Sequence, residues 1–252
     1  MRNFKLIIAF AMLFVVAAMD AQTADKTKKP TIIFAHGLFA DGSSWSEVIP
    51  PLLDAGYDVI SVQNPTSSLA EDVAYTKRAI ARTNGPIVLV GHSWAGFVIT
   101  EAGNDPKVKA LVYVAAYAPD KGETLPGLNA TSGPIELGNY FVKNAGFITL
   151  SKEGVQKAFA ADVTAKQQGV IYATQNAASE NVFNDSVTEA AWKTKPSWYI
   201  VAKNDKAINP DLERFMAKRA KSTTLEVESS HVAMIAKPKQ VLEMILQAAK
   251  QK

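Results

Sequence analysis

Short, almost wholly apolar runs alternate with longer segments of helical character along this chain, and this alternation most constrains its fold. The apolar runs are too short for helices, and several are bounded by glycine or proline. Six of them are expected to be strands: Thr31–Ala35, Asp58–Gln63, Pro86–Val90, Lys109–Ala115, Ser197–Ala202 and Thr224–Val227. Strands that are apolar throughout are typical of a parallel sheet with helices on both faces. The pattern therefore predicts an α/β fold with a doubly wound, mainly parallel six-stranded sheet.

Helices are expected between these strands, at segments with start or stop signals. The expected helices are Ser46–Ala55, Ser68–Thr83, Trp94–Ala102, one that starts at Asn209-Pro210 and one that opens at Pro238. Ser68 is placed as an N-cap with Glu71 three residues later, which is the spacing of a capping box. In the helix after Asn209, the pattern predicts that Leu212, Phe215 and Met216 share the inward face.

The alternation stops between Pro119 and Trp192. Glycines and prolines break the chain there, and two helical pieces, Lys152–Asp162 and Val163–Ala178, belong to no strand pair. Six aromatic residues in this stretch need a surface to cover: Tyr140, Phe141, Phe147, Phe159, Tyr172 and Phe183. We expect a helical cap insertion at about residues 119–192, over one edge of the sheet. The alternative is an ordinary succession of core helices.

The first 24 residues are predicted to lie outside the fold. Arg2 and Lys5 precede an apolar run from Leu6 to Met19, and small residues follow it. This order is typical of a secretory signal peptide, with cleavage after Ala18 or Ala21. A spanning helix needs about 20 apolar residues, so a permanent anchor is the less favoured alternative, as is a buried N-terminal helix. Residues 1–24 are therefore expected to be a signal peptide and short leader, residues 25–252 the functional domain, and the mature protein secreted or periplasmic.

The composition removes several classes of chemistry. The 252 residues include 27 Lys+Arg, 24 Asp+Glu, three histidines and no cysteine. Without cysteine there is no disulfide, no thiol nucleophile and no Cys-ligated zinc, and three histidines are too few for most His-rich metal sites. The small net charge of +3 argues against nucleic acid as the main partner. Any chemistry must then use oxygen nucleophiles, carboxylates and His36, His92 or His231.

One strand-to-helix turn carries the strongest chemical signal. The run Ile87–Val90 leads directly into Gly91-His92-Ser93-Trp94-Ala95-Gly96 and then into a helix. Small residues allow the tight turn that lifts a serine hydroxyl above the sheet edge, and the next backbone N–H lies at a helix N-terminus. Ser93 is the predicted nucleophile and the Trp94 N–H a predicted oxyanion donor. Ala95 stands where the usual pattern has glycine, so the strict motif is broken.

Elimination leaves His231 as the predicted general base for Ser93. His92 lies inside the turn and should point away from the serine, and His36, at the end of the first strand, is better placed to order the following loop. His231 follows the last strand, at the sheet edge where Ser93 is expected.

The acid that orients this base is predicted to be Asp205, which follows the strand Ser197–Ala202. Asp120, after the preceding strand, is the alternative. Asp211 and Glu228 are better explained as a helix-start charge and a surface strand residue. The chain order Ser93, Asp205, His231 is the nucleophile–acid–base order of serine hydrolases with a nucleophile elbow.

The loop after the first strand should supply the second oxyanion donor. Gly37 lets the backbone approach closely, and the Leu38 N–H is the predicted donor, with the Phe39 N–H as the alternative. Phe39 and Trp94, together with cap aromatics, are also expected to contact substrate, although such aromatics more often pack in a core.

With these residues, the chain resembles the serine α/β-hydrolase superfamily over nearly all of residues 30–250. The resemblance rests on His36-Gly37 with Trp45 downstream, the Gly91-His92-Ser93-Trp94 turn, Asp205 and His231. Three further segments are similar to the plant methylesterase and hydroxynitrile lyase group and to bacterial small-ester hydrolases: Trp198-Tyr199-Ile200-Val201, Arg214-Phe215 and Ser230-His231-Val232-Ala233-Met234. The resemblance implies an α/β-hydrolase fold that lacks the first two strands of the eight-stranded parent sheet. Val232 and Gly37 stand where the lyase branch has lysine and threonine, which disfavours cyanohydrin cleavage.

We therefore expect a secreted serine carboxylesterase that cleaves esters with small or medium apolar groups through an acyl-enzyme. It would need no metal or organic cofactor, and its partner would be a small-molecule ester rather than nucleic acid or, after leader removal, a membrane. A cofactor-free perhydrolase or haloperoxidase, and a hydrolase-fold ligand-binding protein with little turnover, are the alternatives. The sequence leaves the oligomeric state and the particular ester open.

Overall fold

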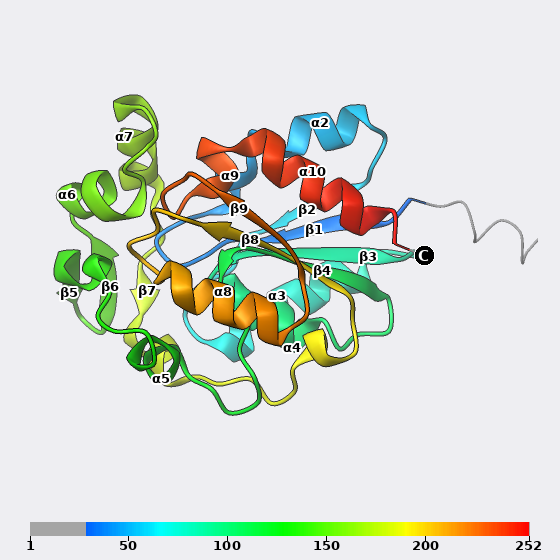
Figure 1. The fold of residues 1–252 in the computed structure, drawn as a ribbon, viewed down its shortest axis with the longest axis horizontal. Coiled ribbons are helices and arrows are strands. Elements are labelled where there is room, and N and C mark those ends of the chain that lie inside the picture. Colours follow the sequence, from blue (N-terminus) through cyan, green and yellow to red (C-terminus); the bar gives the residue numbers. More distant parts are fainter. Residues whose placement is uncertain (1–28, 252) are drawn as a thin grey trace, which may run out of the picture.

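A computed structural model describes residues 29–251 and places one six-stranded sheet at the centre of the molecule (Figure 1). The strand order is β2-β1-β3-β4-β8-β9, and every neighbouring pair is parallel. The strands are β1 (Thr31–Ala35), β2 (Val59–Val62), β3 (Ile87–Ser93), β4 (Val108–Ala116), β8 (Ser197–Ala202) and β9 (Thr223–Val227). The predicted six-stranded parallel sheet is confirmed. The predicted signal peptide lies outside the described residues.

Helices cover both faces of this sheet, which explains why its central strands are apolar throughout. In Figure 1, α2, α9 and α10 lie on one face and α3, α4 and α8 on the other. Their bounds are α2 (Ile49–Asp54), α3 (Leu69–Ala81), α4 (Ala95–Ala102), α8 (Pro210–Arg219), α9 (Ala233–Ala236) and α10 (Pro238–Ala249). Every residue of β1, β3 and β8 is buried, as expected for strands between two helical layers.

Local signals in the sequence position most of these helices correctly. The Ser68 side chain accepts a hydrogen bond from the Glu71 N–H at 3.2 Å and caps α3. The helix expected from Ser46 begins only at Ile49, because the preceding residues form a 3-10 turn (Gly42–Trp45). Phe215 is 53% exposed, so its predicted inward position is wrong. The inward stripe of α8 consists of Leu212, Glu213, Met216 and Ala217, and Phe215 falls on the flank beside the Arg219 guanidinium.

Most of the chain between β4 and β8 forms a separate layer at the carboxyl ends of the sheet strands, whereas the turn Ala191–Lys193 before β8 lies against α4 (Figure 1). This layer, called the cap below, is not purely helical as predicted, since it contains a three-stranded antiparallel sheet, β5-β6-β7. Its regular elements are α5 (Leu125–Ala130), β5 (Phe141–Asn144), β6 (Phe147–Leu150), α6 (Lys152–Gly154), α7 (Ala165–Thr174) and β7 (Ala178–Ser179). Short 3-10 turns at Glu136–Tyr140, Glu180–Asn184 and Ala191–Lys193 connect them, and a π-helical turn spans Val155–Phe159.

The small cap sheet escapes sequence prediction because its strands have only two to four residues. β5 and β6 are joined by Ala145-Gly146, which both have positive φ angles, 49° and 82°. Two successive positive φ values are typical of a type I′ hairpin turn, but alanine in the first position gives no turn signal. In the part of the chain from residue 29 to 251, no helix is both long and apolar enough to cross a membrane.

Helix α4 packs so closely on the end of β4 that it leaves no room for a side chain at Gly96. A Cβ atom at this position would lie 1.7 Å from the Tyr117 carbonyl oxygen. Gly91, in β3, is similarly confined, since its Cβ would lie 2.7 Å from the Ala95 carbonyl oxygen. These close backbone contacts hold the start of α4 against the sheet.

We predict that Gly96→Ala destabilises the protein by about 1–3 kcal/mol or more, because the added methyl group forces backbone atoms apart. Gly169→Ala is the matched control, since Gly169 also lies in a helix but has nothing within 4 Å of its would-be Cβ. That variant should be as stable as the parent or more stable by up to about 1 kcal/mol. Urea unfolding midpoints measure both, and equal stabilities for the two variants would contradict the packing described.

Candidate active site

Ser93 is the last residue of β3, and α4 begins two residues later, so the chain reverses its course sharply at this serine. Ser93 has a φ of 55°, a left-handed conformation that is strained for a residue with a side chain. The pairing of β3 with β4 shifts register between His92 and Ser93. A Cβ at Gly37 would lie 2.7 Å from the Ser93 Cβ, so the loop after β1 can approach the turn only with glycine there.

His231 and Asp205 lie in direct contact. The His231 Nδ1 atom lies 2.6 Å from an Asp205 carboxylate oxygen, and both side chains are almost completely buried. The second Asp205 oxygen accepts hydrogen bonds from the backbone N–H groups of Ala207 (2.7 Å) and Ile208 (3.0 Å). His231 Nε2 is buried and has no hydrogen-bond partner within residues 29–251, and His231 and Ser93 border the same cavity. The hydrogen bond between a serine nucleophile and its histidine base is often long or poorly aligned before substrate binds.

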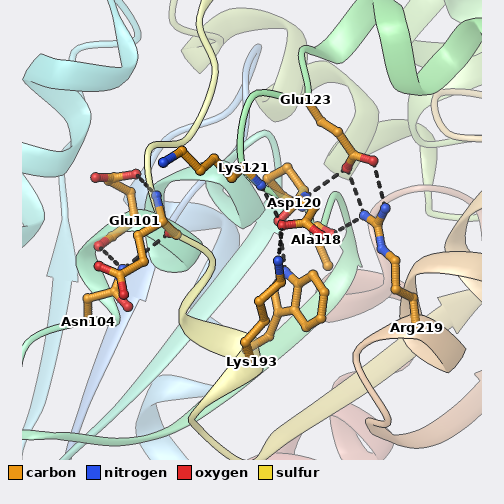
Figure 2. A network of polar contacts seen from close by, with 11 residues as sticks. Glu101, Asn104, Ala118, Asp120, Lys121, Glu123, Lys193 and Arg219 are labelled. Atoms are coloured by element: carbon orange, nitrogen blue, oxygen red, sulfur yellow. Dashed lines mark hydrogen bonds and ion pairs between the residues drawn. The ribbon is translucent and has the colours of Figure 1, made fainter.

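Asp120, the alternative acid, belongs to a different cluster of charges (Figure 2). Its carboxylate accepts a hydrogen bond from Lys193 Nζ at 2.5 Å, and its backbone N–H donates to Glu123. Glu123 in turn binds the Arg219 guanidinium at 2.6–2.7 Å. Partial burial alone would raise the pKa of Asp120, but the hydrogen bond from Lys193 lowers it below the ordinary value. Asp211 forms an ion pair with Arg214, and Glu228 forms one with Lys203. Asp120, Asp211 and Glu228 thus bind other cations, and the carboxylate in contact with His231 is Asp205.

The other two histidines make backbone contacts. His36 Nε2 accepts a hydrogen bond from the Asn64 N–H, and its Nδ1 lies 3.0 Å from the Gly37 carbonyl oxygen. His92 Nε2 lies 3.0 Å from the His231 carbonyl oxygen and can donate to it. Burial lowers the pKa of both side chains, and the nearby His231 lowers that of His92 further. Both are therefore neutral, and His92 ties the backbone of His231 to the serine turn. No sequence pattern indicates this contact.

The Trp94 ring is fully buried and held from α3. Its Nε1–H donates to Asp72 at 2.8 Å, and the ring stacks on Phe97 with centroids 4.9 Å apart. The other Asp72 oxygen accepts from the Thr66 N–H at 2.8 Å. Burial raises the pKa of Asp72 to about 6, although these two hydrogen bonds act in the opposite direction. Because the ring is anchored in this way, the Trp94 backbone N–H is fixed at the start of α4.

Two backbone segments can supply oxyanion donors. Among the turn and loop hydrogen bonds of residues 29–251, none is donated by the N–H of Leu38, Phe39 or Trp94. Phe39 has a φ of 60°, so the loop after β1 turns sharply beside Gly37. Leu38 and Phe39 both border the cavity at Ser93, and the choice between their N–H groups as second donor stays open.

The cavity above Ser93 is small and apolar, with a volume of about 40 Å³. Phe39 and Trp94 of the core layer border it, as do three of the six aromatics that the sequence singled out between residues 119 and 192: Phe141, Phe159 and Phe183. The other three of those six do not: Tyr140, Phe147 and Tyr172. No group of three or more histidine, aspartate or glutamate side chains in the described part of the chain is arranged to hold a metal ion.

Glu213, which no sequence pattern singles out, lies next to Asp205. Its side chain is fully buried, and one carboxyl oxygen accepts from the Ala202 N–H at 3.0 Å. Burial, and then the Asp205 carboxylate, raise the pKa of Glu213 well above its ordinary value. Both influences favour the protonated form of Glu213. Its other carboxyl oxygen has no hydrogen-bond partner within residues 29–251. Only the three-dimensional proximity of α8 to the end of β8 identifies it.

Comparison with known proteins decides the family. The sequence profile of the alpha/beta hydrolase family matches residues 32–244, which is most of the chain. The chain belongs to the alpha/beta hydrolase family. The six-stranded parallel sheet with helices on both faces agrees with this membership.

Individual relatives of this alpha/beta hydrolase are distant. The chain is 24% identical to the alpha/beta hydrolase nvfD of Aspergillus novofumigatus over 243 residues, 88% of this chain and 97% of that protein. A carbendazim hydrolyzing esterase of Nocardioides sp. is 38% identical over 58 residues, 22% of this chain and 24% of that protein. The structure is similar to polyneuridine aldehyde esterase, with a TM-score of 0.75 and 15% identity over 87% of this chain and 99% of that one. It is also similar to a pyrethroid hydrolase from Sphingobium faniae, with a TM-score of 0.73 and 20% identity over 87% and 97%.

The raised pKa of Glu213 predicts a pH-dependent stability for this alpha/beta hydrolase. A proton bound more tightly in the folded state stabilises it at low pH, so this contribution is lost as pH rises above about 4.5, where the unfolded chain releases the proton. Asp72 acts with the same sign, but only up to about pH 6. Between roughly pH 6.5 and 8, Glu213 should make the unfolding free energy of the parent fall by up to about 1.4 kcal/mol per pH unit. The Glu213→Gln variant should lack this part of the fall.

Urea unfolding across this pH range measures the effect. Glutamine preserves the shape of the side chain and can still accept the hydrogen bond from the Ala202 N–H, so the variant should fold normally. Glu189→Gln, at an exposed glutamate, is the control and should keep the parent's pH dependence. An unchanged slope in Glu213→Gln would show that Glu213 is ionised in the folded protein.

Proposed function

We propose that this alpha/beta hydrolase is an exported serine esterase, which cleaves carboxylic esters with small or medium apolar groups through an acyl-enzyme at Ser93. The observation that carries the proposal is the buried His231–Asp205 pair, which leaves His231 Nε2 without a hydrogen-bond partner in residues 29–251, beside a cavity that both His231 and Ser93 border. A base oriented by a carboxylate beside a serine in a strained turn is the arrangement that activates a hydroxyl nucleophile.

The first half of the reaction forms the acyl-enzyme. Ser93 Oγ attacks the ester carbonyl carbon while His231 Nε2 takes the hydroxyl proton, and Asp205 stabilises the resulting imidazolium. The negative charge on the carbonyl oxygen is stabilised by the backbone N–H groups of Trp94 and of Leu38 or Phe39. When the tetrahedral intermediate collapses, His231 gives its proton to the alcohol oxygen, and the alcohol leaves.

The second half repeats these steps with water in place of the alcohol. His231 takes a proton from a water molecule, whose oxygen attacks the acyl carbon. His231 then returns the proton to Ser93 Oγ, and the carboxylic acid is released. The chain's own residues supply the nucleophile, base and oxyanion donors, so these steps need no metal or organic cofactor.

The cavity and the relatives support an apolar ester as substrate. Aromatic side chains line the space at Ser93, and buried apolar walls favour uncharged groups. Several relatives bear esterase or hydrolase names, including polyneuridine aldehyde esterase and the carbendazim hydrolyzing esterase. Export rests on the N-terminal sequence alone, with the apolar run from Leu6 to Met19 after Arg2 and Lys5.

Two asparagine variants test this function and the role of Asp205 together. With p-nitrophenyl acetate as substrate, Asp205→Asn should lower kcat by about three to four orders of magnitude, because the His231 tautomer and the imidazolium lose their support. Asp120→Asn, the matched control, should stay within about threefold of the parent, since Asp120 contacts Lys193 and not the base.

Three outcomes would contradict the proposal. If the parent does not hydrolyse the ester, the function is wrong. If Asp120→Asn loses more activity than Asp205→Asn at equal stability, the acid is wrong. If the parent catalyses peroxide-dependent bromination faster than ester hydrolysis, the protein is a perhydrolase or haloperoxidase instead.

A further inference from the structure

A second hollow, called the outer groove below, lies beside the catalytic cavity. It has a volume of about 250 Å³, and the 3-10 turn after β1, the cap helix α7 and the start of α9 enclose it. Phe159 borders both the outer groove and the catalytic cavity. Its ring is nearly fully buried, with its centroid 5.2 Å from that of His231. The Phe159 ring therefore borders both hollows and lies beside His231.

Helix α7 turns a complete face toward this groove. The residues that face it recur at helical spacing: Lys166, Gln167, Val170, Ile171 and Thr174. Val170 and Ile171 are the apolar residues of this face, beside the polar Lys166, Gln167 and Thr174. No residue of α7 is fully buried: Val170 is 50% exposed, and Ile171 is partly buried against the core. Val170 and Ile171 thus give one wall of an open space an apolar surface, which is the form of a binding groove.

The position of the groove relative to His231 indicates which part of an ester would enter it. Val232, the residue after the base, and Ile235 both line the groove. In the reaction proposed above, the leaving alcohol oxygen receives its proton from His231 Nε2, so the alcohol group must extend on the side of the base. The inner cavity at Ser93 has about one sixth of the groove's volume, which leaves room for only a few heavy atoms.

We propose that the outer groove binds the alcohol part of the substrate, and that the preferred substrates are esters of a short acid with a bulky apolar alcohol, such as an arylmethyl alcohol. This inference rests on the proposed esterase function and adds the substrate class to it. The groove's apolar wall from α7 and α9 holds the alcohol group, and Phe159 forms the boundary between the two parts of the substrate.

A variant that fills the groove tests the assignment. Val170→Trp places a large ring in the groove without entering the catalytic cavity, and Tyr172→Trp adds bulk on the same helix outside the groove. Three substrates separate the two halves of the ester: ethyl acetate, 2-naphthylmethyl acetate and ethyl hexanoate. For Val170→Trp, the ratio of kcat/KM for 2-naphthylmethyl acetate to that for ethyl acetate should fall at least about tenfold. Tyr172→Trp should keep the parent's ratio.

The acyl series distinguishes the proposal from its reverse. In Val170→Trp, the ratio of kcat/KM for ethyl hexanoate to that for ethyl acetate should stay within about twofold of the parent's. A fall in this ratio would show that the groove holds the acyl chain, and unchanged ratios for all esters would show that it holds neither part. Either result overturns the groove assignment and leaves the esterase function intact. If the parent hydrolyses none of the three esters, the esterase function is overturned, and the groove assignment with it.

Discussion

Ser93 has a positive φ of 55°, and the rest of the site depends on the contacts that keep it there. Helix α4 is pressed against the end of β4, where Gly96 leaves no space for a Cβ beside the Tyr117 carbonyl. The loop after β1 closes on the other side, with Gly37 against Ser93. A strained residue persists only where its surroundings leave no relaxed alternative, and here backbone atoms on both sides do so. The consequence is a serine hydroxyl at the sheet edge and a helix N-terminus directly behind it.

His231 is held as firmly as the serine, by contacts from different parts of the chain. Asp205 contacts its ring, and His92, inside the serine turn, contacts its backbone carbonyl. The buried Asp205 carboxyl group accepts hydrogen bonds from two backbone N–H groups and lies next to Glu213, whose pKa is raised by burial and by Asp205. Because a buried polar group without hydrogen-bond partners is costly, these contacts compensate for burying Asp205 behind His231. Serine and base are therefore positioned by one connected set of buried interactions.

The sequence predicted those features that local patterns determine. Continuous apolar runs located all six strands of the main sheet, and a serine between small residues located the turn at Ser93. With three histidines in the chain, elimination selected His231, and sheet-edge position favoured Asp205, the carboxylate that the structure places on its ring. The roles of these residues in catalysis remain proposals that experiments must test.

Features that depend on tertiary packing were beyond the reach of sequence patterns. The cap sheet has strands too short to show a period, and its hairpin turn lacks the usual residues. Phe215 fits the expected helical face but falls on its flank, because the sheet lies nearer to Glu213. Glu213 and Asp72 are buried acids, and nothing in a linear sequence distinguishes them from the exposed acids around them. The outer groove likewise depends on how α7 lies relative to the turn after β1 and to α9, which no local pattern shows.

The reactivity of Ser93 toward a fluorophosphonate tests the central claim most directly. A phosphonylating probe reacts with a serine hydroxyl only where a base activates it and oxyanion donors stabilise the adduct. Mass spectrometry of the intact chain should show one adduct per molecule, and peptide mapping should place it on Ser93. Ser93→Ala and heat-denatured protein should remain unmodified. An unmodified parent chain, or an adduct on another serine while Ser93 stays free, would contradict the account.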